Sequence, residues 1–467
     1  MRKLFLIAFY YSGALITYVD PFYGVLMYTF MNIVRPEQLA WGDRGFAGRI
    51  FLIMQLACFT SWFMNKEKLT PEYTPLPFQI KLMLFIIVGI HISGFFGITL
   101  PEWQAKWSGQ FMKITLFCFI ISKSINTPKK LEQYYASALF CFVFLEIWGV
   151  FQKLGGNPFM EGIGGDQLGD RNDLGSVAVL YFPMAYYSIY SRNKWVKLGI
   201  GIPATIVFII FILFTESRGA ALGLSTCLLL IFLRTPGVQK IKMLFTVGIV
   251  GVLLLLVMIP LAPEGFFDDY TARLRTMLGD EDIESGEVEY EGSAAGRLAM
   301  WKAAYYFMKQ HPEYWLTGLG MKGFRASYFK HIDEIEPYLT PEEYHHILFG
   351  GSGGKAIHNT YINMATSGGL LVFLPWSALL FYSWYQAHVI PKRYPRIVDG
   401  VNIHNYARAV EIGLLGAFIS ITFINADFVD FYYWHMAMAG VIANFGKAKL
   451  KKEASGEEED EFLETSL

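Results

Sequence analysis

Long apolar runs recur along most of the chain, separated by short polar segments. A helix needs about 20 mostly apolar residues to cross the hydrocarbon core of a bilayer, which is about 30 Å thick. The runs therefore predict membrane-spanning helices over 4–34, 48–64, 78–97, 109–123, 132–151, 174–191, 197–214, 218–233, 243–262, 359–387, 406–424 and 428–446. These runs give about twelve spans if the first one crosses once, and one more if Pro21 divides it into two short helices.

Basic residues in the short loops predict the orientation of these helices. Under strict alternation, the loops that carry Lys66, Lys123, Arg192, Arg234 and Lys392 all fall on one side. Lys and Arg are enriched in the cytoplasmic loops of membrane proteins, so this side is expected to be the cytoplasm. The favoured arrangement has about twelve spans and both termini in the cytoplasm.

Composition agrees with this class, because 54% of the residues are hydrophobic and only 17% are charged. We therefore expect an all-α polytopic membrane protein with one large extracytoplasmic loop domain. The net charge of -1 argues against a nucleic-acid partner. All four cysteines lie inside apolar runs without metal-ligand spacing, which argues against disulfides and against zinc at these positions.

The polar segments define the expected domains. We predict an N-terminal helix bundle over 1–262, an extracytoplasmic loop domain over 263–357, C-terminal membrane helices over 358–447 and a disordered charged cytoplasmic tail over 448–467. Within the loop domain, the acidic stretch 280–291 is expected to be a solvated loop because it lacks the ligand spacing of an EF-hand. Ser293 is expected to cap a helix over 295–309, which the glycines from Gly318 onward follow.

Two charged residues, Glu216 and Arg218, interrupt the apolar sequence in "FTESRGAALGL". Charges near a membrane are costly, so each is expected to have a partner or a function. One interpretation is an interfacial hairpin in which Glu216 pairs with Arg218. The predicted topology also puts Arg218 on the same face as Arg297, Lys355 and His358, so the four side chains could share one extracytoplasmic cavity.

The chain resembles the O-antigen ligase and polymerase superfamily in three segments that occur in order. These are "TESRGAALG", "AAGRLAMWKAAYYFMKQHPEYWLTGLGMKGF" and "HNTYINMATSGGLLVFLPW", which together extend from 214 to about 380. Members of this superfamily are bacterial membrane glycosyltransferases that use polyprenyl-diphosphate-linked glycans. The opening "YVDPFYGVLMYTFMNIVRPEQLAWG" also resembles the O-glycosylation ligases found beside exosortase A systems.

The resemblance assigns catalytic roles to three residues. Arg218 and Arg297 occupy the arginine positions of the superfamily and are expected to clamp the diphosphate, because a guanidinium can bond two phosphate oxygens at once. His358 occupies the position of the catalytic histidine, and its neutral imidazole would accept the proton of the attacking hydroxyl. The arginines would replace a divalent ion, so we expect neither a metal nor a cofactor.

Five further residues are expected to bind substrate, because they lie in the matching segments or on the same predicted face. They are Lys355, Asn359, Glu216, Trp301 and Arg171. Asn359 is also a candidate to cap the helix that follows His358, or to orient its imidazole.

The resemblance implies a metal-independent, inverting glycan ligase of the bacterial cytoplasmic (inner) membrane, with its active site facing the periplasm. The donor would be an oligo- or polysaccharide on undecaprenyl diphosphate, and the acceptor a hydroxyl of a lipid A core sugar or of a protein. A polymerase, whose acceptor is another lipid-linked glycan, uses the same chemistry. A transporter for the lipid-linked glycan is an alternative of another class, although it would need charged residues along a path through both leaflets.

Overall fold

The computed structural model describes residues 2–39, 47–67, 69, 73–157, 160–163, 168–241, 294–348 and 356–455, together with six single positions between 243 and 271. The predicted span 243–262 lies mostly outside these residues, and the acidic stretch 280–291 lies wholly outside them. Ser293 and Lys355 also lie outside the described residues. The described chain is almost entirely helical, as the apolar runs predict.

The long helices follow the predicted apolar runs closely. They are α1 (Arg2–Ile16), α2 (Pro21–Val34), α3 (Ala47–Asn65), α4 (Phe78–Phe96), α5 (Pro101–Ser124), α6 (Pro128–Leu154), α7 (Arg171–Ser188), η3 (Trp195–Gly201), α8 (Ile202–Phe214), α9 (Arg218–Arg234), α16 (Thr360–Arg393), α17 (Ile403–Ser420) and α18 (Asp430–Ser455). Because α18 continues to Ser455, the first part of the segment predicted as a disordered tail is helical.

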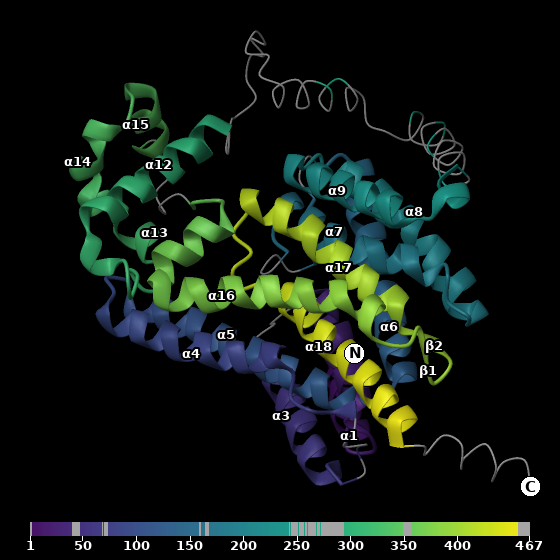
Figure 1. Ribbon diagram of the computed structural model, residues 1–467. Helices are drawn as coiled ribbons and strands as arrows, with labels where there is room; N and C mark the ends of the chain where they lie inside the picture. The colour runs from purple at the N-terminus through teal and green to yellow at the C-terminus, as the bar shows by residue number, and fades with distance from the viewer. Residues whose placement is uncertain are drawn as a thin grey trace, which may run out of the picture.

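Five described helical segments are long and apolar enough to cross a membrane. They are Phe78–Phe96, Pro128–Leu154, Trp195–Phe214, Thr360–Arg393 and Ile403–Phe423. Figure 1 shows α16 running across the whole molecule, from the helices around α13 to the hairpin of β1 (Ile397–Val398) and β2 (Val401–Asn402). The protein is thus an all-α polytopic membrane protein, whereas the predicted count of twelve spans is not confirmed.

The first apolar run forms two antiparallel helices. Pro21 begins α2, and the Asp20 carboxylate caps this helix by accepting a hydrogen bond from the Phe22 N–H at 2.9 Å. The rings of Phe9 in α1 and Phe30 in α2 then pack edge to face with their centroids 5.9 Å apart. Lys130, at the start of α6, bonds Asp20 at 2.7 Å, so the turn lies at that end of the bundle. The alternative in which Pro21 divides the run is therefore the one observed, and α1 begins at the opposite end.

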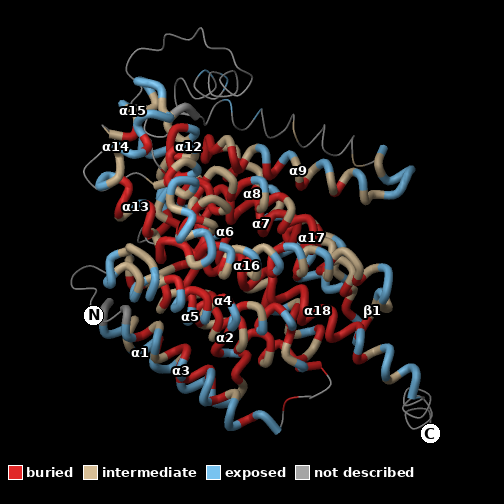
Figure 2. The backbone as a smooth tube through the Cα atoms, turned by 60° about the vertical axis from the view of Figure 1, so that its left-hand side comes forward, coloured by how far each residue is buried: buried red, intermediate tan, exposed pale blue. Residues whose placement is uncertain are grey.

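The main core lies where α7, α17 and α18 pack together behind α16. Figure 2 shows this centre as mostly buried, with α1 and α3 more exposed at the periphery. Every residue of α18 from Phe431 to Phe445 is buried. A helix that is buried on all sides must be surrounded by other elements, so α18 is a central element of the bundle.

A second, smaller core belongs to the helices between α9 and α16. These are α12 (Ala294–Gln310), η4 (Pro312–Tyr314), α13 (Gly323–Ser327), η5 (Tyr328–His331), α14 (Ile332–Ile335), η6 (Glu336–Tyr338) and α15 (Pro341–Leu348). The apolar face of α12, with Met300 and Phe307, is buried against Phe324, Tyr328 and Ile347. The helix predicted over 295–309 is thus confirmed, and it carries a hydrophobic core separate from that of the bundle.

Backbone hydrogen bonds attach this second core to a break in α16. Leu319 N–H donates to the carbonyl of Thr366 at 2.9 Å, and Leu370 N–H donates to the carbonyl of Trp315 at 2.9 Å. Gly369 interrupts the helix there with φ 57° and ψ -165°. The segment 315–319 therefore occupies the backbone groups that the interrupted helix leaves open.

Two glycines make this close approach possible. A Cβ atom on Gly318 would lie 2.4 Å from the Gly369 nitrogen, and both glycines have positive φ. Side chains at either position would therefore meet backbone and adopt a strained conformation. This contact fixes the second core against the end of α16 where His358 lies.

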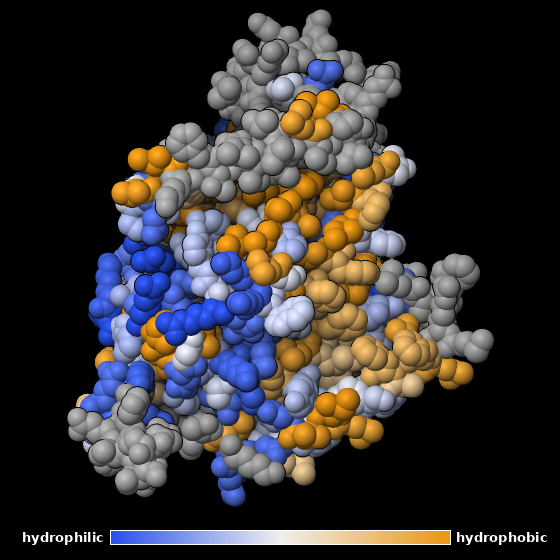
Figure 3. All heavy atoms as spheres, turned by 90° about the vertical axis from the view of Figure 1, so that its right-hand side faces the viewer, coloured by the Kyte–Doolittle hydropathy of each residue, from blue (hydrophilic) through white to orange (hydrophobic). Residues whose placement is uncertain are grey.

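The other end of the bundle is polar. It contains the β1–β2 hairpin, where Val398 pairs with Val401, and the basic end of α16 with Lys392 and Arg393. Figure 3, which faces the right-hand side of Figure 1, shows hydrophilic side chains gathered together beside a broad hydrophobic surface. A polar end next to apolar flanks is the pattern expected where a helix bundle leaves the bilayer.

Candidate functional site

Three helix N-termini meet at the end of the bundle near the second core. The Asp170 carboxylate caps α7 by accepting the Asn172 N–H at 2.6 Å and the Asp173 N–H at 3.0 Å. A Cβ atom on Gly175 would lie 2.8 Å from the Cβ of Ala220, so the first turns of α7 and α9 are in contact. Helix N-termini carry partial positive charge, which favours anions at this end.

The third N-terminus belongs to α16. Asn359 caps it, because its side-chain oxygen accepts the Ile362 N–H at 3.0 Å. Thr360 then ties the helix to the link between α17 and α18, since its hydroxyl donates to the carbonyl of Ile424 at 2.8 Å. The capping role expected of Asn359 is thus confirmed, whereas the structure does not test its expected contact with substrate.

Arg297 and Arg218 lie close enough to affect each other's charge. Burial lowers the pKa of Arg297, and the positive charges of Arg218 and Arg171 lower it further, while Asp170 opposes them. The Nε atom of Arg297 is buried and has no hydrogen-bond partner among the described residues. A half-buried guanidinium beside two other arginines costs free energy, and an anionic ligand would offset that cost.

The side chain of Glu216, just before α9, links this helix to α6 and α7. It adopts the left-handed conformation with φ 51° just before the helix. Its side chain is buried and bonds Lys153 of α6 at 2.7 Å and Arg171 of α7 at 3.2 Å. These salt bridges reach Lys153 and Arg171, and the ion pair with Arg218 that the sequence suggested stays a prediction. Glu216 and Arg171 therefore position the turn that presents Arg218.

His358 lies immediately before α16 with its backbone held on both sides. The indole N–H of Trp301 donates to the carbonyl of Ile357 at 2.9 Å, and Asn359 on the other side caps the helix. His358 itself has φ 50°, a conformation that is uncommon for residues other than glycine. Trp301, which the sequence placed among the substrate-binding residues, thus forms a hydrogen bond that holds the segment carrying His358.

The surroundings of His358 favour its neutral form. Burial lowers the pKa of His358, and the positive charges of Arg297, Arg325 and Lys322 lower it further. These effects outweigh the opposing charge of Asp170 and bring the pKa to about 4. The imidazole is therefore neutral at neutral pH and retains one nitrogen that can accept a proton. The structure thus brings Arg218, Arg297 and His358 to one end of the bundle, while Lys355 lies outside the described residues.

Lys322 is a charged residue at this end that the sequence interpretation missed. It has φ 58°, and its Nζ lies 2.9 Å from a carboxylate oxygen of the buried Asp427. The same Nζ lies 5.1 Å from the ring centroid of Trp107 and 5.8 Å from that of Phe428. Two sequence signals could have revealed the pair: a lysine between the glycines of "GMKGF", and an aspartate between two apolar runs.

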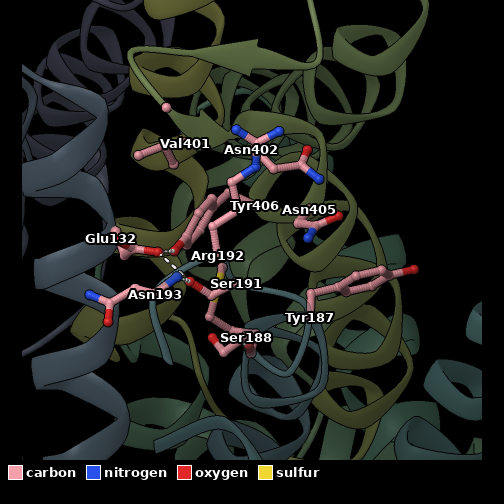
Figure 4. A pocket seen from close by; sticks show the side chains of 12 residues that line it. Glu132, Tyr187, Ser188, Ser191, Arg192, Asn193, Val401, Asn402, Asn405 and Tyr406 are labelled. Carbon is pink, nitrogen blue, oxygen red and sulfur yellow. Dashed lines mark hydrogen bonds between the residues drawn. The ribbon is translucent and has the colours of Figure 1, made fainter. Parts of the chain in front are cut away.

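A pocket at the opposite end of the bundle has a different character (Figure 4). It lies where α7 ends and α17 begins, and most of its side chains are neutral and polar, including Ser188, Asn402 and Asn405. Glu132 accepts a hydrogen bond from the Ser191 hydroxyl there at 2.6 Å. No histidine is among the described residues that line this pocket, so the cluster around His358 is the stronger candidate for group transfer.

Comparison with known families points to the same part of the chain. Residues 203–377 match the family model described as O-antigen ligase, and this range contains Arg218, Arg297 and His358. Residues 1–166 match a family of unknown function. No curated protein matches the chain at a significant level. The narrower resemblance to ligases found beside exosortase A systems stays a prediction.

Proposed function

The chain belongs to the O-antigen ligase superfamily through residues 203–377, and from this premise we propose that it transfers a glycan from a polyprenyl diphosphate to an acceptor hydroxyl outside the cytoplasmic membrane. The donor is an oligo- or polysaccharide on undecaprenyl diphosphate. The acceptor is a sugar of a lipid A core or a protein side chain. The reaction inverts the configuration of the transferred sugar.

One observation carries this proposal: the half-buried guanidinium of Arg297, whose Nε has no hydrogen-bond partner in the described part of the chain, lies beside Arg218 and influences the neutral imidazole of His358. The acceptor oxygen attacks the anomeric carbon, and the bond from that carbon to the diphosphate oxygen breaks. The electron pair of this bond stays on the diphosphate, where Arg218 and Arg297 stabilise the charge. The proton of the acceptor hydroxyl moves to His358.

The direct test is transfer by the purified protein in a lipid environment. Lipid-linked glycan is incubated with a lipid A core acceptor, a protein acceptor or no added acceptor, and glycosylated products and free undecaprenyl diphosphate are measured. A ligase yields a glycosylated acceptor and an equal amount of the free diphosphate lipid. Elongated lipid-linked glycan without added acceptor would identify a polymerase. Movement of the intact lipid-linked glycan across the vesicle membrane, without cleavage of its bond to the diphosphate, would identify a transporter and contradict the proposal.

The proposed orientation puts the second core outside the cytoplasm, because the basic loops gather at the opposite end. All four native cysteines are buried, so introduced cysteines can be labelled with little background. We expect Tyr305→Cys on α12 to react with an impermeant reagent in intact cells, and Lys194→Cys to react only after permeabilisation; both native side chains are exposed. The reverse pattern would overturn the orientation. A reporter before α1 is expected on the same side as Tyr305, because α1 and α2 form a hairpin. The N-terminus is thus proposed outside the cytoplasm, in place of the cytoplasmic position that the sequence predicts.

The proposed chemistry needs no divalent ion, because guanidinium groups neutralise the diphosphate. Transfer is therefore expected to continue at a similar rate after brief treatment with a chelator. The experiment also tests whether the acidic stretch that includes Asp280 and Asp282, which lies outside the described residues, binds an ion that the reaction needs. Complete loss of transfer by protein that remains folded, restored by adding one divalent ion, would contradict a metal-independent reaction.

A further inference from the structure

Two histidines and a glutamate meet at the surface of the second core, away from the cluster around His358. His311 follows the last residue of α12, His331 ends η5, and Glu334 lies in α14. One carboxylate oxygen of Glu334 lies 2.7 Å from Nε2 of His311, and the other lies 2.7 Å from Nδ1 of His331. The three candidate ligand atoms lie within 4.8 Å of one another.

A second carboxylate orients the first histidine. Nδ1 of His311 lies 3.1 Å from a side-chain oxygen of Glu313. With its Nδ1–H donated to Glu313, His311 would present the lone pair of Nε2 to an ion bound beside Glu334. Histidines that bind metals almost always donate their other N–H to a carboxylate, a carbonyl or water, and Glu313 supplies such an acceptor.

We propose that His311, His331 and Glu334 form a binding site for a divalent transition-metal ion, with Zn²⁺ the best candidate. Imidazole nitrogens and a carboxylate are ligands that zinc prefers, whereas Ca²⁺ and Mg²⁺ prefer oxygen ligands. Bonds of about 2.0–2.2 Å to a tetrahedral ion separate its ligands by roughly 3.3–3.5 Å. Small side-chain rotations therefore bring the three atoms into range, and water completes the coordination.

The site is accessible from the aqueous phase. The side chains of His311, His331 and Glu334 are 22%, 31% and 41% exposed. The rings of the two histidines also pack against Phe307, with centroids 4.6 Å and 5.4 Å from its ring. An ion can thus enter from solvent while the buried aromatic ring restricts the orientation of both ligands.

This metal site is separate from the proposed catalytic site. Arg297 lies near the start of α12, and His311 directly follows its last residue, fourteen positions later. At 1.5 Å per helical residue, this separation corresponds to about 21 Å. The ion would join the end of α12 to η5 and α14, where the Gln310 side chain already donates to the Glu334 carbonyl at 2.8 Å. The expected role is therefore structural: it braces the helix that carries Arg297.

The test measures metal content, so it does not depend on the proposed transferase activity. The full chain is purified without a polyhistidine tag, stripped with a chelator, equilibrated with Zn²⁺ and freed of excess ion, and retained zinc is quantified by mass spectrometry. We expect about one zinc per chain, because the three ligands form one site. His311→Ala and His331→Ala are expected to reduce the retained zinc to the background level. Replacement by Co²⁺ is expected to give the visible absorption of a four-coordinate ion.

Two further variants separate the site from unspecific binding. Glu313→Gln keeps all three ligands but weakens the orientation of His311, so the affinity for zinc is expected to fall by about 10- to 100-fold. The double variant His345→Ala/His346→Ala removes two other histidines of the same domain and is expected to retain zinc. Thermal unfolding of each metal-free variant shows whether it still folds.

Three outcomes would overturn the proposal. The wild-type chain could retain no zinc, the His311→Ala and His331→Ala variants could retain as much zinc as the wild-type chain, or zinc could be lost only in the His345→Ala/His346→Ala control. In the first case, the two imidazoles and Glu334 form only a hydrogen-bonded brace. Zinc binding together with a failed glycan-transfer assay would leave the metal site in place and contradict only the proposed function.

Discussion

His358→Ala is expected to lower the rate of glycan transfer by about 10²- to 10⁴-fold, which is the usual effect of removing a general base. The variant is expected to retain the lipid-linked donor, because Arg218 and Arg297 are proposed to bind its diphosphate. The fold should also survive, since Asn359 and Thr360, which fix the start of α16, are unchanged. Transfer and donor binding are measured on the same purified variant.

The matched control for this variant is His345→Ala, because His345 is an exposed histidine of the same extramembrane helices. It is expected to transfer glycan at the wild-type rate. Wild-type transfer by His358→Ala would contradict the role of proton acceptor. Loss of donor binding along with transfer would instead assign His358 to the diphosphate contacts, and another group would have to take the proton.

The pH dependence of the wild-type enzyme tests the same role without a mutation. Because the pKa of His358 is lowered to about 4, the imidazole is neutral above that pH and protonated below it. Only the neutral form can accept a proton, so kcat/KM is expected to stay level from neutral pH downward and to fall as the pH approaches 4. An ordinary histidine would give this decrease near pH 6.5. The residual transfer by the His358→Ala variant should not show this decrease toward pH 4.

Arg297→Ala is the second variant with a large expected effect, a decrease of about 10²- to 10³-fold in transfer, as for the loss of one preorganised group that stabilises transition-state charge. Arg218→Ala is expected to behave similarly. Arg297→Lys and Arg218→Lys should restore only part of the rate, because one ammonium cannot reproduce a two-pronged contact with diphosphate oxygens. Initial rates are compared at equal protein in the membrane.

Stability separates a functional Arg297 from a structural one. The lowered pKa of Arg297 and the lack of a partner for its Nε among the residues that the structure describes indicate that its charge is costly in the folded chain. Removing it is therefore expected to leave the unfolding temperature unchanged or to raise it, even though transfer is lost. A structural arginine would show the opposite, a lower unfolding temperature with transfer reduced only in proportion to the folded protein.

Lys302→Ala provides the control on the same helix. Lys302 lies on α12 and forms an ion pair with Glu343 at 2.7 Å, with 45% of its side chain exposed. Exposed pairs of this kind contribute little, so neither transfer nor stability should change markedly. If Arg297→Ala matches Lys302→Ala in both measurements, Arg297 does not belong to the catalytic site.

The sequence alone determined the membrane class, most helix boundaries and the three candidate catalytic residues. Helix positions follow from local properties: the hydropathy of a run, the break at Pro21 and the cap that Asn359 provides. These depend on neighbouring residues and are therefore visible in the order of amino acids. Arg218, Arg297 and His358 were recognisable because their segments resemble those of a known superfamily.

Only the tertiary structure decided which distant side chains meet. Glu216 bonds Lys153 and Arg171, Lys322 bonds Asp427, and His311 meets His331 and Glu334. Each contact depends on which helices or turns lie side by side, and hydropathy carries no information about adjacency. The physical reason is that the apolar face of a helix can pack against many partners, whereas an ion pair or a metal site forms only when the whole arrangement brings its members within a few ångströms.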